Sequence, residues 1–323
     1  MRIAWIILTG ALVLLAIGVA IWLGRLPSAM DIDEADPTSA ADRTPPLRIG
    51  LIPERDIFEQ RRRYRALADY LAAKLGRPVE LVSSNTYEGV LKDFAEARVD
   101  AAFLGSLVAT LAMDRHDAQV LLKPEVEGGI ATYRGVILVR ADSPIQSVDD
   151  LAGHSIAMVK ATTAGDLFPM FEMVRRGLAQ SPQPPEIKWV GTHDAVIREV
   201  AVGRADAGSA KDLRLDAYEA AHPAVRIRRL AASDPVPNNA LVIRAGVADE
   251  IGPALARIML AMDREETGRE TLAAFGAVRF VPCRPEEYEA VYEMADSLGE
   301  QWAALGVSGP PPKRRGGRPD PPG

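Results

Sequence analysis

The sequence predicts an α/β fold built as two similar lobes, each a mainly parallel sheet flanked by helices, with a ligand cleft between them. Strand-like and helix-like segments alternate along the chain. In addition, the unit TYEGVLKDFAEARVDA at 86–101 returns as THDAVIREVAVGRADA at 192–207, without a gap and with six identities. An accidental match of two amphipathic helices is less economical than a duplicated lobe, because the match continues into the following strand.

The first half of the chain begins with LRIGLIP at 47–53, whose alternating apolar residues and final turn signal predict a strand. A helix is expected over 64–76, where apolar residues recur at helical spacing and glycine ends the run. The segment VELVSS at 79–84 predicts a second strand. The first copy of the repeat then supplies a helix over 87–97 and a buried strand over 99–105.

The second half predicts the same order of elements. RGVILVR at 134–140 and HSIAMV at 154–159 are strand-like, and a helix is expected from about 163 to 177. EIKWVG at 186–191 predicts the strand that precedes the second copy of the repeat. The remaining expected elements are a return strand in PNNALVIR at 237–244 and helices at 249–262 and 285–305.

Residues 1–29 are predicted to be a membrane anchor or a cleaved signal peptide. The run from Ile3 to Gly24 is apolar and uncharged, and about 20 such residues can span a bilayer. Arg2 before it and the acidic residues after it favour an exported body. The run is longer than the ~7–15 apolar residues of most signal peptides, yet 26–29 contains a weak cleavage site, so both alternatives stay open.

The sequence also predicts the division of the chain into domains. Residues 30–46 are rich in Asp, Ala and Pro and are expected to be a linker. Residues 306–323 are rich in Pro, Gly and Arg and are expected to be a disordered tail. Lobe one is predicted to contain 47–140 and 237–305, and lobe two 141–236, with hinges near 140–144 and 233–237.

Composition excludes several classes of function. The net charge is −6 and no predicted helix carries a basic stripe, which argues against nucleic acid as a partner. The only cysteine is Cys283, so neither an internal disulfide nor N-terminal lipid attachment is expected. Motifs for a phosphate loop, a hydrolase elbow or a zinc peptidase are missing, and no metal or cofactor is predicted. His193 is the one obvious candidate base, with no carboxylate placed to orient it, so the protein is not expected to be an enzyme.

Two features indicate an anion-binding cleft. Tyr87 and His193 occupy the same strand-to-helix loop in the two copies of the repeat, and ligands of α/β sheets lie at such loops. In KATTAGDLFP at 160–169, the threonines and Gly165 open a helix after a strand. Backbone N–H groups and the dipole at a helix start favour an anion. An ordinary threonine cap without a ligand is the alternative for this loop.

The chain resembles the phosphonate, phosphite and phosphate receptors of ABC importers, the PhnD-like family. The stretch TYRGVILVRADSPIQSVDDLAGHSIAMV at 132–159 carries the most specific likeness, supported by YRALADYLAAKLGRPVELV, ARVDAAFLGSL, TTAGDLFP and SDPVPNNALVIR. The resemblance covers nearly all of 47–305. It implies a type II periplasmic binding protein, without cofactors, whose lobes close on a ligand by hinge motion.

The resemblance also implies a ligand set in this sequence. It contains Tyr87, Tyr133, Thr162, Thr163 and His193, the backbone of Ala164 and Gly165, and Asn239. Phenol, hydroxyl, imidazole and backbone N–H groups all donate hydrogen bonds that strengthen toward a charged acceptor. Ala164 and Asn239 depart from the family, which has a serine and an aspartate there. The neutral amide at 239 suggests that aminoalkyl phosphonates are poor ligands.

The expected function is therefore an extracytoplasmic receptor for phosphite, phosphate or a phosphonate that delivers its ligand to an ABC permease and ATPase. It is expected on the periplasmic side of the inner membrane, held by its N-terminal helix or soluble after cleavage. One alternative keeps the fold: a membrane-anchored sensing subunit that signals to a sensor kinase.

Overall fold

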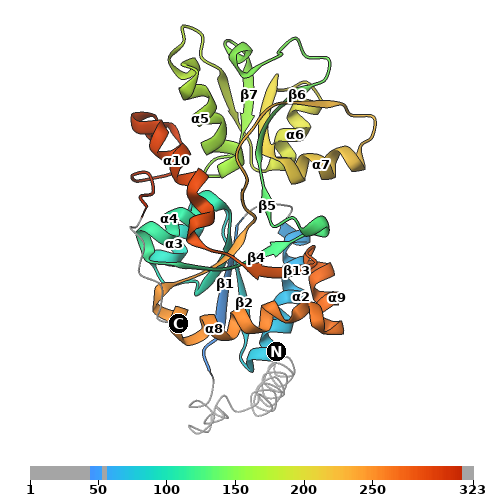
Figure 1. Ribbon diagram of the computed structural model, residues 1–323, viewed down its shortest axis with the longest axis vertical. Coiled ribbons are helices and arrows are strands. Elements are labelled where there is room, and N and C mark those ends of the chain that lie inside the picture. Colours follow the sequence, from blue (N-terminus) through green and yellow to red (C-terminus); the bar gives the residue numbers. More distant parts are fainter. Residues whose placement is uncertain (1–43, 53–56, 315–323) are drawn as a thin grey trace, which may run out of the picture. The chain divides into compact units, whose positions relative to one another are not determined.

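The computed structural model describes residues 44–52 and 57–314, which contain two mixed sheets and a short two-stranded ladder (Figure 1). The six-stranded sheet has the order β13-β4-β12-β3-β1-β2 and the five-stranded sheet the order β10-β6-β9-β7-β8. The first contains β1 (Leu47–Leu51), β2 (Val79–Ser83), β3 (Ala101–Leu104), β4 (Gln119–Glu125), β12 (Ala240–Ile243) and β13 (Arg279–Pro282). The second contains β6 (Gly135–Arg140), β7 (Ser155–Met158), β8 (Glu186–Trp189), β9 (Ala207–Lys211) and β10 (Ile227–Ala232).

Helices flank both sheets. Lobe one, defined by the six-stranded sheet, carries α2 (Ile57–Leu75), α3 (Tyr87–Ala95), α4 (Ser106–His116), α8 (Ala245–Leu260) and α9 (Glu266–Phe275). Lobe two, defined by the five-stranded sheet, carries the π-helical turn η3 (Thr163–Leu167), α5 (Phe168–Arg175), α6 (His193–Ala201) and α7 (Asp212–Ala221). The last long helix, α10 (Glu289–Leu298), packs against α5 of lobe two and α4 of lobe one (Figure 1).

Both sheets repeat one strand order. The order β2-β1-β3-β12-β4 in lobe one corresponds to β8-β7-β9-β6-β10 in lobe two. The first three strands of each set are parallel, and the other two add antiparallel pairs. Thus the parallel half of each lobe holds the repeated unit, whereas β12 and β6 enter directly from the connecting ladder without a helix and run the opposite way.

The two copies of the repeat begin with the same cap. The Thr86 hydroxyl accepts a hydrogen bond from the N–H of Gly89 (3.0 Å), and the Thr192 hydroxyl accepts one from Ala195 (3.1 Å). Both caps have extended backbone dihedrals, as a residue just outside a helix does. The shared threonine therefore starts α3 and α6 in the same way.

The two copies also end with equivalent hydrogen bonds to a neighbouring strand. The Asp100 carboxylate accepts from the N–H of Arg48 at the start of β1 (2.9 Å). Asp206 accepts from the N–H of Ser155 at the start of β7 (2.8 Å). Each aspartate thus joins the repeated unit to the neighbouring parallel strand. The shared arginines lie just before them and pair with an acid of the preceding helix, Arg98 with Asp93 and Arg204 with Glu199.

Two segments join the lobes side by side. The ladder strands β5 (Thr132–Tyr133) and β11 (Val236–Pro237) pair in antiparallel fashion, and the Ser233 N–H donates to the carbonyl of Gly135 (2.8 Å). Since β6 pairs with β9 and β10, residues 135–140 belong to the five-stranded sheet and not to lobe one as expected. The first connection consequently lies near 131–135, and the prediction of 140–144 is wrong.

Residues 305–310, named here the C-terminal strap, contact both lobes. The Gly306 N–H donates to Asp166 of lobe two (3.1 Å), while the Ser308 N–H donates to Glu88 of lobe one (3.0 Å). Arg115 of lobe one donates to the carbonyl of Ser308 (2.7 Å). These bonds contradict a disordered tail starting at 306; the remainder of that tail, 315–323, lies outside the described residues.

The predicted anchor or signal peptide at 1–29 and most of the predicted linker also lie outside the described residues. Within 44–52 and 57–314, none of the helices combines the length and the apolar composition that crossing a bilayer requires.

Candidate functional site

A small cavity bordered by several polar side chains lies between the lobes, at the carboxyl ends of the parallel strands. Its volume is about 10 Å³ for the centre of a water-sized sphere, so its walls nearly touch. Lobe one, lobe two and the ladder all contribute to it. The described residues that line it are Tyr87, Gly105, Val108, Tyr133, Ala161, Thr162, Thr163, His193 and Lys211.

Five of the eight residues predicted from the sequence line this cavity: Tyr87, Tyr133, Thr162, Thr163 and His193. The other three lie next to it. Ala164 and Gly165 belong to the same π-helical turn as Thr163, and Asn239 contacts the lining residue Lys211. The folded chain thus brings residues that are far apart in the sequence to the same cavity.

Tyr87 and His193 reach the cavity for the same reason. Each is the first residue of its helix, α3 or α6, directly after the capping threonine. Their side chains are 6% and 2% exposed, respectively. The duplicated strand-to-helix loop therefore presents a phenol from lobe one and an imidazole from lobe two.

Thr162 and Gly165 build the turn. The Thr162 hydroxyl donates to the Val159 carbonyl (2.9 Å) and accepts from the Gly165 N–H (3.0 Å), so it serves as a cap. A Cβ atom at Gly165 would lie 2.8 Å from the Thr162 hydroxyl and 2.9 Å from Val159. Glycine is required here for packing within the turn.

Thr163 connects the two lobes beside the cavity. Its hydroxyl accepts a hydrogen bond from the N–H of Leu107, in the first turn of α4 (2.8 Å). A hydroxyl that accepts still has its own proton to donate. Ala164, behind it, is fully buried, and its carbonyl accepts from the Ser209 hydroxyl (2.6 Å). The backbone of this turn is therefore fixed from both sides.

Asp166 is a buried acid within the turn. One carboxylate oxygen accepts from the N–H groups of Ala161 (2.7 Å) and Gly306 (3.1 Å). Burial raises the pKa of Asp166 to about 6, while these two bonds and the charge of Lys160 act in the lowering direction. The carboxylate holds Ala161, a lining residue with a left-handed φ of 57°, in place.

Four lining residues were missed in the sequence: Gly105, Val108, Ala161 and Lys211. Lys211 is the one that carries charge. Its ammonium donates to the side-chain oxygen of Asn239 (2.8 Å) and lies 4.4 Å from the centroid of the Tyr133 ring. A signal existed: extending the two aligned repeats by four residues places Lys211 opposite Gly105.

The chemistry of the described lining suits a small anion. It presents phenol, hydroxyl and imidazole groups, an ammonium group and the N-terminal turns of helices. None of the described residues that line the cavity is an Asp or a Glu. The electrostatic field of these groups consequently favours negative charge.

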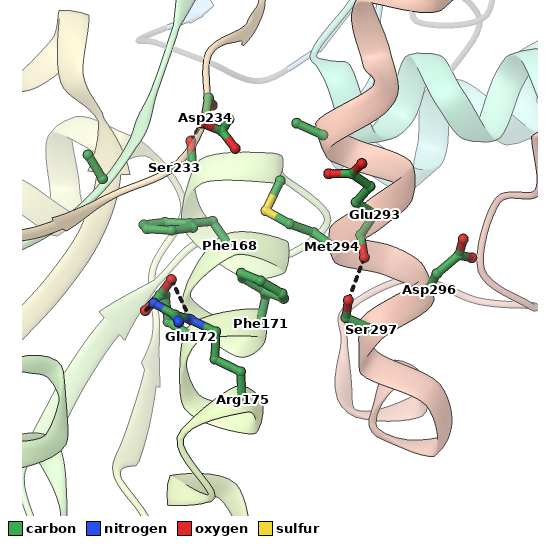
Figure 2. Close-up of a pocket in the computed structure, with 12 residues that line it drawn as sticks. Phe168, Phe171, Glu172, Arg175, Ser233, Asp234, Glu293, Met294, Asp296 and Ser297 are labelled. Atoms are coloured by element: carbon green, nitrogen blue, oxygen red, sulfur yellow. Dashed lines mark hydrogen bonds and ion pairs between the residues drawn. The ribbon is translucent and has the colours of Figure 1, made fainter.

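A wider groove between α5 and α10 has the opposite character (Figure 2). It has a volume of about 670 Å³ by the same measure. Glu293 and Asp296 from α10 and Asp234 from the connecting segment line it, with Phe168 and Met294 as apolar surface. Because acidic side chains repel anions, this groove does not fit the ligand that the small cavity favours.

Metal chemistry finds no support in the part of the chain that the structure describes. There, no group of three or more His, Cys, Asp or Glu side chains could hold an ion. Cys283 is buried beside the Tyr288 hydroxyl (3.4 Å), and burial raises the pKa of its thiol. It behaves as a core residue.

Two α/β lobes, joined by paired connecting segments with a small cavity between them, define a solute-binding protein of the type II periplasmic class. The chain belongs to the family described as "ABC transporter, phosphonate, periplasmic substrate-binding protein", which it matches over residues 49–288. Members of this family bind solutes and are not enzymes, in agreement with the sequence prediction.

The comparison with a curated relative is partial. The chain is 28% identical to the phosphonates-binding periplasmic protein of Escherichia coli over 115 residues. This match spans 36% of the present chain and about a third (34%) of the relative.

Solved structures share the fold over most of the chain. A Xanthomonas citri protein bound to a chloride ion has a TM-score of 0.70 and 23% identity, and covers 80% of this chain and 99% of its own. A phosphonate-transporter binding protein of Pseudomonas aeruginosa has a TM-score of 0.67 and 16% identity, and covers 81% of this chain and 94% of its own. PhnD1 of Prochlorococcus marinus, in complex with methylphosphonate, has a TM-score of 0.67 and 18% identity, and covers 79% of this chain and 98% of its own.

Proposed function

We propose that this protein is an extracytoplasmic receptor for a small phosphorus oxyanion: phosphite, phosphate or a simple phosphonate. The observation that carries the proposal is the composition of the cavity between the lobes. Tyr87, His193 and Thr163 bring hydrogen-bond donors to it from both lobes, and Lys211 brings a positive charge. Charge-assisted hydrogen bonds of this kind are about twice as strong as neutral ones.

Lobe movement admits the ligand. The cavity volume of about 10 Å³ is close to the minimum that holds one water molecule, so an oxyanion requires wider separation of the lobes. The chain passes between the lobes at the paired connecting segments, β5 and β11. A small rotation there would open the cavity, and closure around the anion would exclude water and strengthen its hydrogen bonds.

The proposed partners follow from this class of receptor. The closed form would deliver its ligand to an ABC permease with its ATPase, on the periplasmic side of the inner membrane. Attachment through residues 1–29 belongs to the same proposal. A sensing subunit with the same fold would bind the same anion and differ only in its partner.

Thermal unfolding with single anions in excess tests the ligand class. Phosphite, phosphate, methylphosphonate, 2-aminoethylphosphonate and sulfate would be compared, using the mature exported chain. A ligand at 100 times its Kd stabilises by about 2.7 kcal/mol, which is readily measured. We expect a shift with at least one phosphorus anion that is lost in Tyr87→Ala and in His193→Ala. Equal melting temperatures with all five anions would overturn the proposal.

A further inference from the structure

We propose that the C-terminal strap, residues 305–310, opposes separation of the two lobes and thereby limits how readily the cavity between them opens. The proposal goes beyond the proposed function, because it concerns the movement of the lobes and holds for any solute. It arises from where the strap is attached in each lobe and from the short stretch of chain between the two attachments.

The attachment to lobe two lies at the cavity wall. The Gly306 N–H donates to Asp166 (3.1 Å), and the same carboxylate oxygen accepts from the N–H of Ala161 (2.7 Å), which lines the cavity. Gly306 also packs on Lys160, because a Cβ atom at 306 would lie 2.6 Å from the Cβ of that lysine. One buried oxygen therefore holds both the strap and a residue of the cavity wall.

The attachment to lobe one lies next to the cavity as well. The Ser308 N–H donates to Glu88 (3.0 Å), which directly follows the lining residue Tyr87 in the first turn of α3. Arg115, in the last turn of α4, donates to the carbonyls of Ser308 (2.7 Å) and Pro310 (2.5 Å). Among the described hydrogen bonds, three thus join the strap to lobe one and one joins it to lobe two.

The strap is a packed segment of the fold. The side chains of Leu305 and Val307 are 6% and 7% exposed and belong to the larger hydrophobic core. The buried indole of Trp302 donates its N–H to the carbonyl of Gly309 (2.7 Å). These contacts fix the path of the strap, so its two attachments cannot move far apart by uncoiling a loose loop.

The length of chain between the attachments limits lobe movement. Gly306 and Ser308 are two residues apart, and two fully extended residues span about 7 Å. A rotation at β5 and β11 that widened the cavity would move Asp166 away from Glu88, so one attachment would have to break. The single bond to Asp166 is the weaker side. A groove of about 660 Å³, lined by strap residues together with Glu88 and Lys160, gives the released strap space to move.

Distances between two spin labels, measured by pulsed electron paramagnetic resonance on the full mature chain, test the proposal without any ligand. The labels are attached through Glu96→Cys and Val202→Cys, exposed and equivalent positions at the ends of α3 and α6. Cys283 is buried and does not compete for the label. Because α3 and α6 begin at the cavity in opposite lobes, opening must separate them.

Two variants on lobe one weaken the strap without changing a lining residue of the cavity. The wild type should show mainly the distance that the structure gives for these positions. In Glu88→Ala and in Arg115→Ala, the ratio of open to closed molecules should rise about tenfold, which corresponds to about 1.4 kcal/mol. Glu88→Gln keeps an oxygen acceptor for the Ser308 N–H and should retain most of the short distance, which loss of the side chain would not.

A matched control and a kinetic measurement complete the test. Arg65→Ala removes an exposed arginine and its ion pair with Asp69 within α2, and should leave the distances unchanged. If the cavity binds phosphite as proposed above, phosphite should also dissociate about tenfold faster from Arg115→Ala than from the wild type. Distances that are the same in the wild type and both strap variants would overturn the proposal, as would a wild type that is mainly open. A strap effect on the distances in a protein that binds no anion would contradict the proposed function alone.

Discussion

The Thr163 hydroxyl of lobe two accepts a hydrogen bond from the Leu107 N–H of lobe one at 2.8 Å, directly beside the candidate cavity. Leu107 lies in the first turn of α4, where N–H groups have no acceptor within the helix. One side chain therefore both satisfies a helix end of the opposite lobe and borders the cavity, which links lobe closure to the ligand site.

Thr163→Val should weaken ligand binding while the protein still folds. Valine has nearly the same shape as threonine but cannot accept from Leu107 or donate to an anion. We expect the Kd for the bound oxyanion to rise by about tenfold, as a loss of about 1–1.5 kcal/mol predicts. Titration calorimetry measures this change, and Thr163→Ser should retain most of the affinity. An unchanged Kd in Thr163→Val would contradict a role in closure.

The sequence predicted the duplicated lobe because the residues shared by the two copies make equivalent structural interactions in each lobe. Thr86 and Thr192 cap helices, and Asp100 and Asp206 join strands. These interactions span only short stretches of chain or adjacent strands, so they leave a visible pattern. The repeat also placed Tyr87 and His193 in equivalent loops, and both residues line the cavity.

Contacts between distant segments could not be predicted in this way. In the sequence, Lys211 is a polar residue at the end of a strand of small residues. Its contacts with Tyr133 and Asn239 are seen in the folded structure. The strap was assigned to a disordered tail because its composition is poor in apolar residues. Its hydrogen bonds to Asp166 and Glu88 arise from the folded arrangement of both lobes.

Asp166 should make stability depend on pH between about 4 and 6. The pKa of this acid is raised from 3.8 to about 6, so the folded state binds its proton more strongly than the unfolded state. Stability is then greatest when both states are protonated and falls as pH rises through about 6, by about 3 kcal/mol. Urea unfolding from pH 4 to pH 7.5 should show this decrease relative to Asp166→Asn. A constant difference between wild type and variant across that range would contradict the prediction.

Gly306→Val should destabilise the strap. A Cβ atom at 306 would lie 2.6 Å from the Cβ of Lys160, which cannot move without its backbone. We expect a loss of about 1–3 kcal/mol in the free energy of unfolding, as overpacking usually costs. Ser308→Ala is the matched control, because Ser308 is exposed and uses its backbone groups in the strap. Equal stability of the two variants in urea unfolding would show that the strap is not packed as described.

Thr86→Ala and Thr192→Ala should cost nearly the same stability. Each removes one side-chain cap from the first turn of an equivalent helix, and the loss of such a cap costs about 1 kcal/mol in the free energy of unfolding. Thermal unfolding of both variants and of the two serine replacements measures the effect, and serine should preserve it. A large cost in one copy alone would argue that the two units are not equivalent.

Calorimetric titration of methylphosphonate or phosphite into the wild-type protein and into Tyr87→Ala tests whether the cavity between the lobes binds an oxyanion. We expect saturable binding of one anion per protein chain in the wild type. We expect that binding to be lost in Tyr87→Ala, with the variant still folded. Saturable binding that persists unchanged in the variant would place the site outside the cavity between the lobes, and absence of binding in the wild type would contradict a receptor for these anions.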